Sequence, residues 1–259
     1  MKEIIPITED EFNNVVAQTG FKYALMQKDY YATIILYLLK DVKGIYFKGG
    51  TALNKIFLNY ARISEDIDYS VSKDLKNVEK EIRKIIKASP LFHSVTHDKR
   101  VQKFTRLIAH YKGFDNQEDT IFIDLNEKSN LILKPEKHKV PHHYSENIPE
   151  FSVMTLAKKE MLAEKVAAAI GRNKPRDHFD VYMILKSKEP LDMNLVKKKC
   201  ESSGDDFNII KMFNKAKKLK NRWDEDMVPL LVEKIGFKEV MQTLAKHFDL
   251  KGEKEKQDH

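Results

Sequence analysis

Residues 48–53 read Lys-Gly-Gly-Thr-Ala-Leu, and residues 62–68 read Arg-Ile-Ser-Glu-Asp-Ile-Asp. The residues that lead into the glycine pair, 44–48, form a short apolar run that is typical of a strand. Residues 51–59 carry apolar side chains at helical spacing, and residues 66–71 alternate between polar and apolar side chains. The pattern therefore predicts a strand, a glycine turn and a helix, followed by a second strand that carries two acids.

Asp66 and Asp68 are expected to project from the same face of the second strand, because side chains two residues apart on a strand share a face. Two carboxylates this close repel each other, and a divalent cation offsets the repulsion. Mg²⁺ prefers hard oxygen ligands and is commonly held by one or two carboxylates together with substrate phosphates. Asp124 is the candidate for a third carboxylate that would complete a two-metal site. Asn126 or Glu127 could supply the third ligand in its place. The acids predict a site for Mg²⁺, or Mn²⁺ in its place, that holds a nucleoside triphosphate (NTP).

Gly49 and Gly50 allow the backbone to approach a phosphate closely. If Thr51 opens a helix, its free N–H groups and the helix dipole face the same anion, and its hydroxyl can reach a β- or γ-phosphate. The stretch is not a Walker loop, because a lysine precedes the glycines and no Gly-Lys-Ser/Thr follows. Arg62 and Ser64 can reach phosphate oxygens or hold the loop. The predicted nucleotide-binding residues are Lys48, Gly49, Gly50, Thr51, Arg62 and Ser64.

The composition is that of a soluble globular protein. The chain has 259 residues, of which 42% are hydrophobic and 33% charged, enough for one large or two modest domains. The single cysteine, Cys200, excludes an internal disulfide and a multi-thiolate zinc site, which suits a reducing cytoplasm. The sequence has no apolar run of about 20 residues and no apolar signal core at its N-terminus. We expect a cytoplasmic protein without a membrane partner.

The predicted fold class is α+β: a small mixed sheet flanked by helices, of the type that the resemblance described below implies for a nucleotidyltransferase, followed by a C-terminal helical bundle. We expect an α/β domain over residues 1–150 and a helical domain over 151–259, with the boundary in the Pro/His-rich stretch 135–149. Predicted helices of the first domain cover 8–19, 28–40, 51–59 and 76–88, and predicted strands cover 44–48, 66–71, 101–112 and 120–126. Predicted helical segments of the second cover 155–171, 176–187, 192–219 and 227–248, before a charged tail, 251–259, expected to be disordered.

The two motifs quoted first resemble the signature of the AbiEii/AbiGii toxin family, nucleotidyltransferase-like proteins of the DNA polymerase β superfamily found in bacterial type IV toxin–antitoxin and phage-defence loci. The upstream Lys28-Asp-Tyr-Tyr and the downstream stretch from Lys165 to Asp180 also resemble the family. The similarity covers roughly residues 10–190 and, more loosely, the helical end. It implies an enzyme that transfers a nucleoside monophosphate from an NTP to the 3′ acceptor end of tRNA, which blocks translation until a partner antitoxin neutralises it.

Lys165 lies on a small apolar helical face, from which it either snorkels to the surface or projects into a site. Asp177 and Asp180 are one helical turn apart. In a purely structural role they would cap the start of the helix and form a salt bridge to Arg172 or Arg176. The resemblance implies that Lys165 acts near the triphosphate and Asp180 at the active site, both contributed to the cleft by the helical domain. The predicted catalytic residues are then Asp66, Asp68, Lys165 and Asp180, and the predicted metal ligands are Asp66, Asp68 and Asp124.

The net charge of +7 includes a basic run over residues 211–222 that contains no acid. This run can neutralise the phosphates of a nucleic acid, or it can be a solvated helix face. Trp223 after the run can stack on a base, but we expect it to anchor the core between helices. Two other functions stay open: a nucleotidyltransferase with a small-molecule or protein acceptor, and a non-catalytic nucleotide-binding module.

Overall fold

The computed structural model describes residues 3–127, 131–172 and 174–255 of the chain. The chain folds into two compact units, Met1–Ala157 and Lys158–His259. The division falls later than the expected residue 150, because strand β7 (Ser152–Thr155) pairs with two strands of the first unit.

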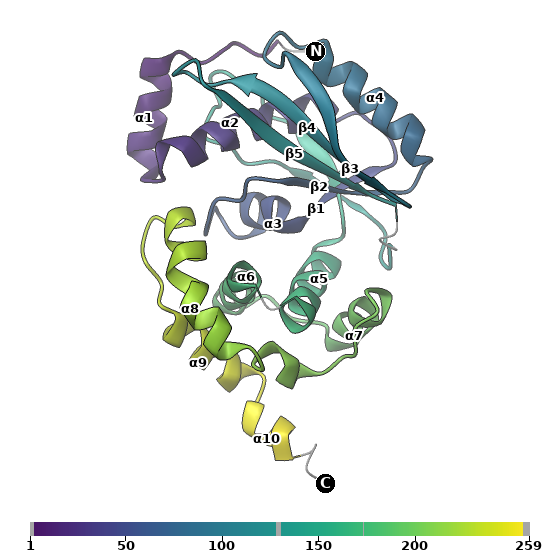
Figure 1. The fold of residues 1–259 in the computed structure, drawn as a ribbon, viewed down its shortest axis with the longest axis vertical. Coiled ribbons are helices and arrows are strands. Elements are labelled where there is room, and N and C mark those ends of the chain that lie inside the picture. The colour runs from purple at the N-terminus through teal and green to yellow at the C-terminus, as the bar shows by residue number, and fades with distance from the viewer. Residues whose placement is uncertain (1–2, 128–130, 173, 256–259) are drawn as a thin grey trace. The chain divides into compact units, whose positions relative to one another are not determined.

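A mixed sheet lies at the centre of the first unit (Figure 1). The strand order is β3-β4-β5-β2-β1-β7-β6, in which β2 and β5 are parallel, β1 and β7 are parallel, and the other neighbours are antiparallel. The strands are β1 (Ile45–Lys48), β2 (Ile67–Val71), β3 (Ser94–Val101), β4 (Phe104–Lys112), β5 (Glu118–Asn126), β6 (Glu136–Lys139) and β7. The helices are α1 (Glu9–Thr19), α2 (Tyr23–Leu39), α3 (Gly49–Ala52), the π-helix η1 (Leu53–Phe57) and α4 (Leu75–Lys87). The predicted mixed sheet with flanking helices is confirmed.

One face of the sheet is apolar and is covered by α2 and α4, which contact each other as well as β5 and the β3–β4 hairpin. Alternation along β5 buries Ile121, Ile123 and Leu125 completely on this face. Tyr31 of α2 stacks on Tyr111 of β4 with ring centroids 3.8 Å apart. The residues between these apolar ones, Phe122 and Asp124, therefore project from the other face, which we call the polar face because it carries Asp124.

Strands β3, β6 and β7 lie where no strand was predicted, and the expected strand over 101–112 begins instead at Phe104, after the hairpin turn. β3 and β6 are the two edge strands of the sheet. Only Val95 of β3 is buried, and β6 has no buried residue. Edge strands with so little buried surface lack the alternation by which a strand is recognised in a sequence.

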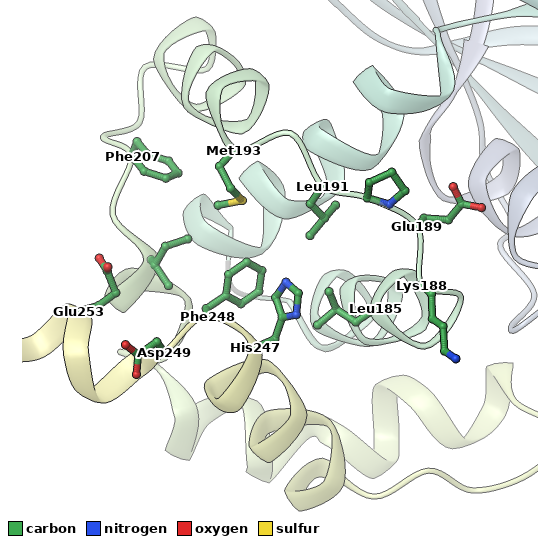
Figure 2. Close-up of a pocket in the computed structure, with 12 residues that line it drawn as sticks. Leu185, Lys188, Glu189, Leu191, Met193, Phe207, His247, Phe248, Asp249 and Glu253 are labelled. Atoms are coloured by element: carbon green, nitrogen blue, oxygen red, sulfur yellow. The ribbon is translucent and has the colours of Figure 1, made fainter.

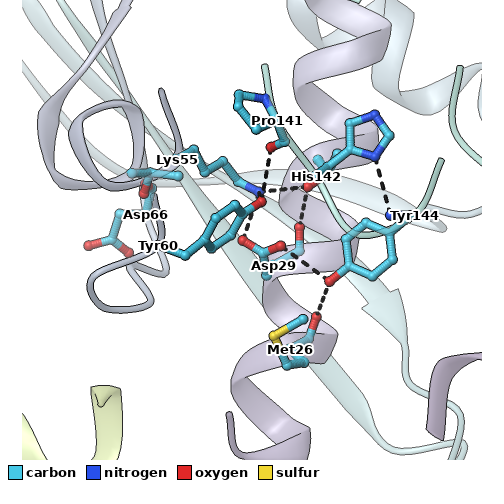
Figure 3. A network of polar contacts seen from close by, with 10 residues as sticks. Met26, Asp29, Lys55, Tyr60, Asp66, Pro141, His142 and Tyr144 are labelled. Atoms are coloured by element: carbon cyan, nitrogen blue, oxygen red, sulfur yellow. Dashed lines mark hydrogen bonds and ion pairs between the residues drawn. The ribbon is translucent and has the colours of Figure 1, made fainter. Parts of the chain in front are cut away.

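A buried ion pair anchors the segment that follows the glycine turn (Figure 3). Lys55 of the π-helix lies 2.8 Å from Asp29 of α2, and both side chains are only 2% exposed. The Lys55 ammonium also donates to the hydroxyls of Thr33, at 2.9 Å, and Tyr60, at 2.7 Å. The Tyr144 hydroxyl donates to the second oxygen of Asp29 at 3.2 Å. Burial lowers the pKa of Lys55, and the charge of Asp29 partly offsets this.

Lys55→Met removes the buried cation and keeps an unbranched side chain that is one atom shorter. Asp29 is then a buried carboxylate without its cation, so we expect the free energy of unfolding to fall by about 3–5 kcal/mol. The double variant Asp29→Asn, Lys55→Met buries no uncompensated charge and should lose clearly less. Urea unfolding of both variants tests this, and equal losses would show that the charge balance does not stabilise the segment.

The second unit is helical, as predicted. Its elements are α5 (Lys158–Gly171), α6 (Pro175–Lys186), α7 (Met193–Ser202), η2 (Ile209–Met212), α8 (Ala216–Met227), η3 (Val228–Leu230), α9 (Phe237–His247) and α10 (Leu250–Glu255). The single segment expected over 192–219 is divided, because the chain turns at Gly204 with φ +75° before α8 begins. The tail expected to be disordered is helical as far as Glu255, and residues 256–259 lie outside the described part.

Trp223 anchors the packing of α8 in this unit. It is 1% exposed, and its indole N–H donates to the carbonyl oxygen of Ile235 at 2.9 Å. The prediction of a core anchor is therefore confirmed over the alternative of base stacking. Within the described ranges, every helix is too short or too polar to cross a membrane.

Candidate active site

Four charged residues occupy directly opposite positions on adjacent strands. Asp68 of β2 lies opposite both Lys48 of β1 and Asp124 of β5, and Asp124 lies opposite Arg106 of β4. Residues directly opposite each other share a face of the sheet, and neighbouring strands are about 4.7–4.9 Å apart. Lys48, Asp68, Asp124 and Arg106 therefore form a row across the polar face, which we call the charged row. It places two carboxylates side by side, with a cation at each end.

Asp66 lies next to this row, immediately before β2. The pKa of Arg106 is raised by its hydrogen bonds to Asp124 and further by the charges of Asp124 and Asp66. Asp66, Asp68 and Asp124 are each half-buried. The fold thus brings the three predicted acids to the same part of the sheet.

The two glycines of the turn make room for the protein's own side chains. Gly49 has φ +77°, in the left-handed region that favours glycine, and a Cβ added to it would lie 2.1 Å from Asp68 Oδ2. A Cβ on Gly50 would lie 2.9 Å from both Arg62 Nη2 and Ser64 Oγ. A close approach to a phosphate was expected here. Instead, the groups against the glycine backbone are a carboxylate, a guanidinium and a hydroxyl of the chain itself.

Thr51 and Arg62 hold the turn that carries the acids. The helix begins at the first glycine rather than at Thr51, which is 1% exposed and donates its hydroxyl to the backbone carbonyl of Asp66. A contact between this hydroxyl and a phosphate would require that hydrogen bond to open. Arg62 is 2% exposed, and its backbone N–H donates to Asn54 Oδ1 at 3.3 Å. Both residues are placed where they fix the position of the acids.

Arg106 is a site residue that the sequence did not identify. Its Nε and Nη2 donate to Asp124 Oδ1 and Oδ2, each at 2.7 Å, a bidentate geometry that is strong and directional. The carboxylate predicted as a third metal ligand is therefore engaged by a cation of the protein. The sequence indicates this role only weakly, because Arg106 is one arginine on the polar side of a predicted strand and nothing in the sequence identifies its partner.

A second cluster of charges lies in the second unit. The Lys165 ammonium is 3.1 Å from Asp177 Oδ1 and 2.9 Å from Asp180 Oδ2, and Arg172 also reaches Asp177 at 3.0 Å. Lys165 is 8% exposed and Asp180 is fully buried. Lys165 therefore does not snorkel to the surface. The predicted salt bridge between Asp177 and Arg172 is present.

Asp177 carries an unsatisfied atom within this cluster. Its Oδ2 is buried and has no hydrogen-bond partner among the described residues. Burial raises the pKa of Asp177, but the charges of Lys165 and Arg172 outweigh burial and lower it overall. A buried oxygen in this state can accept a hydrogen bond from a ligand.

The acids of the first unit suit a divalent cation that is completed by a substrate. Over the described parts of the chain, no three or more His, Cys, Asp or Glu side chains are grouped so as to hold a metal. Asp66 and Asp68 carry the hard oxygen ligands that Mg²⁺ takes, and Asp124 nearby also accepts two hydrogen bonds from Arg106. Two carboxylates fit an ion whose other ligands are phosphates and water better than a closed protein cage.

A cavity of about 710 Å³ in the second unit is separate from these residues (Figure 2). Leu185, Met193, Phe207 and Phe248 line it, and its lining residues include none of the predicted catalytic ones. It is therefore not part of the candidate site.

The mixed sheet, the glycine turn and the acids beside it are those of a nucleotidyltransferase. The family described as "Nucleotidyl transferase AbiEii toxin, Type IV TA system" matches residues 38–245, most of the chain. The chain belongs to this family of nucleotidyltransferase toxins, which confirms the resemblance. No curated protein matches the sequence.

Several solved structures share the fold, and two of them are described here. JHP933 from Helicobacter pylori superposes with a TM-score of 0.58 at 19% identity, over 92% of this chain and 97% of that one. MenT4, a nucleotidyltransferase toxin from Mycobacterium tuberculosis, has a TM-score of 0.57 at 21% identity, over 82% of this chain and 72% of that one. At these identities the similarity establishes the fold.

Gly49→Ala tests whether the space beside Gly49 fixes the position of the Asp68 carboxylate. The added Cβ displaces the Asp68 carboxylate, so we expect Mn²⁺ affinity, measured by electron paramagnetic resonance titration, to fall about tenfold or more. Gly44→Ala is the matched control, since Gly44 has φ +85° and the atoms nearest to its added Cβ belong to the side chain of Lys73, at 2.6 Å. Both variants strain the backbone similarly, but only the first moves a ligand. Equal Mn²⁺ affinity in the two variants would contradict this role of Gly49.

Asp177→Asn tests the ion pairs of the second unit. A carboxyl whose pKa is lowered by folding stabilises the protein above its ordinary pKa of 3.8, and this stabilisation is lost as the pH falls through the folded value. We expect the variant to be less stable than the parent at pH 7, with a gap that shrinks below about pH 4. Urea unfolding at both pH values measures this.

Asp224→Asn is the control for that measurement. Asp224 pairs with Lys234 at 2.6 Å, but its side chain is 65% exposed, so its loss should change stability by less than about 0.5 kcal/mol. A gap between Asp177→Asn and the parent that does not vary with pH would show that the charge of Asp177 does not stabilise the fold.

Proposed function

We propose that the chain transfers a nucleoside monophosphate from an NTP to the hydroxyl at the 3′ acceptor end of tRNA and releases pyrophosphate. The transfer would block translation until a partner antitoxin neutralises the protein, in a toxin–antitoxin or phage-defence setting. The observation that carries the proposal is the charged row, in which Asp68 and Asp124 lie side by side and Asp68 is seated against Gly49. Family membership supports the type of reaction, and the tRNA acceptor rests on the resemblance described from the sequence.

In this proposal Asp66 and Asp68 hold Mg²⁺, or Mn²⁺ in its place, together with the phosphates of the NTP. The bound ion would activate the attacking hydroxyl and neutralise the leaving pyrophosphate. Asp124 is held by Arg106 and serves as a third carboxylate when that ion pair opens. An aspartate with an ordinary pKa of about 3.9 is a weak base at neutral pH, so it needs such an activated hydroxyl.

In the covalent step one bond to phosphorus forms and one breaks. A bond forms between the acceptor oxygen and the α-phosphorus of the NTP, and the bond from that phosphorus to the bridging oxygen of pyrophosphate breaks. The hydroxyl proton passes to a carboxylate of the site. The resemblance described from the sequence supports a role of Lys165 near the triphosphate, and Asp180, buried against Lys165, holds its ammonium in place.

Apart from the two glycines, the predicted nucleotide-binding residues are of two kinds. Thr51 and Arg62 are buried and position the turn, whereas Lys48 and Ser64 are half-buried and can reach phosphate oxygens. The complete set in the proposal is Lys48, Gly49, Gly50, Thr51, Arg62 and Ser64.

The test incubates the protein with each of the four NTPs, labelled at the α-phosphate, together with Mg²⁺ and tRNA. We expect label on tRNA with at least one NTP, no label in the presence of a chelator, and about 10²-fold less with Asp66→Asn or Asp68→Asn. Asp41→Asn, whose carboxylate is 78% exposed, is the control and should label normally. If the label appears on a protein or a small molecule instead, the acceptor is that molecule and not tRNA. A complete lack of label with all four NTPs would contradict the transfer reaction.

A further inference from the structure

The start of α8 presents a group of exposed lysines, which we call the α8 lysines: Lys215, Lys217, Lys218 and Lys220. In the described part of the chain, no ion pair joins any of these four ammonium groups to a carboxylate. On the opposite side of the helix, Leu219, Trp223 and Met227 are buried at intervals of four residues. This packing fixes the orientation of α8, so the α8 lysines face solvent.

The charges of α8 run against the helix dipole. Cations are favoured near the C-terminus of a helix and anions near its N-terminus. In α8 the first turn is basic and contains no acid, while the last turn carries Asp224, Glu225 and Asp226 and no base. Lys218 and Arg222 also place like charges four residues apart, which is unfavourable. Helix stability therefore does not explain the α8 lysines.

α4 shows the contrasting arrangement. It also exposes four lysines, but Lys84 and Lys87 lie in its last turn, where the dipole favours them. The helix dipole therefore accounts for two of the four exposed lysines of α4, although Lys76 lies in its first turn, and it accounts for none of the α8 lysines.

The basic stretch is joined to the Lys165 cluster within the second unit. His178 follows Asp177 in α6 and is fully buried. One ring nitrogen of His178 lies 2.8 Å from the carbonyl oxygen of Met212, and the other lies 3.0 Å from that of Lys174. Met212 ends η2, three residues before the first α8 lysine. α6 and α8 also pack against each other.

We infer that the α8 lysines bind the phosphate backbone of the RNA acceptor and hold it beside the Lys165 cluster, an inference that rests on the proposed function. Unpaired, exposed cations attract phosphates by releasing counterions, without a preference for sequence. The exposed side of this helical stretch has no large apolar residue, and an interfacial membrane helix needs such residues. With Trp223 buried, the contact is electrostatic and does not involve base stacking.

The test compares two quadruple variants. In the α8 variant, Lys215, Lys217, Lys218 and Lys220 become Gln; in the matched α4 variant, Lys76, Lys80, Lys84 and Lys87 become Gln. Both variants lose four positive charges, and Gln has a helix propensity close to that of Lys. Fluorescence anisotropy with labelled tRNA over a range of KCl concentrations gives the affinity and its salt dependence.

For the α8 variant we expect the slope of log affinity against log salt to shrink by about 3, because each of the four lost phosphate contacts contributes about 0.7–0.9. Its affinity near 0.1 M salt should fall more than about tenfold. The α4 variant should change the slope by less than about 1. The melting temperature of the α8 variant should stay the same or rise, because the removed charges oppose the helix dipole.

The labelling assay separates this inference from the proposed function. At saturating tRNA the α8 variant should keep the parent's labelling rate and show only a higher KM for tRNA. If the parent labels no RNA but binds tRNA through the α8 lysines, the proposed reaction is wrong, and the inference that the α8 lysines bind RNA is still supported. If the α8 and α4 variants bind tRNA equally, the surface is wrong. Loss of binding to phosphatidylserine vesicles in the α8 variant, with tRNA binding unchanged, would also overturn it.

Discussion

Asp68 and Asp124 are held side by side on neighbouring parallel strands, where their negative charges repel each other. They cannot separate, because the backbone hydrogen bonds of β2 and β5 fix the register of the two strands. Lys48 and Arg106 lie at the two ends of the row and reduce the electrostatic cost. A divalent cation would reduce it further, and this is the physical argument for the metal-dependent transfer proposed above.

The position of these acids depends on residues that carry out no chemistry themselves. Gly49 gives the Asp68 carboxylate room that any side chain would occupy, and the Thr51 hydroxyl fixes the backbone at Asp66. Beneath them, the buried pair of Lys55 and Asp29 ties the π-helix to α2. Positioning of this kind keeps ligands within a fraction of an ångström of a productive geometry.

Local patterns in the sequence predicted part of this arrangement. The glycine turn and the spacing of Asp66 and Asp68 are readable because strand alternation is a short-range property. The partnership of Asp124 with Arg106 depends on the pairing of β4 with β5, which no local pattern specifies. The edge strand β3 was missed because nearly all its side chains are exposed.

The helical unit shows the same division between local and long-range information. The expected helical segments, 192–219 and 227–248, left residues 220–226 of α8 outside any predicted helix, although Trp223 within this gap was correctly expected to be a core anchor. Whether Lys165 snorkels or is buried could not be decided from its own helix, because the answer depends on Asp177 and Asp180 of the next one. The direction of charge along α8, by contrast, is visible in the sequence and becomes informative once its buried face is known.

The most direct measurement is a crystal structure of the protein with Mn²⁺ and a non-hydrolysable NTP, in which anomalous scattering locates the ion. The arrangement described here predicts an anomalous peak bound by the carboxylates of Asp66 and Asp68, beside Gly49, with triphosphate oxygens as further ligands. A peak at another place in the protein, or a triphosphate bound without an ion at these two acids, would contradict it.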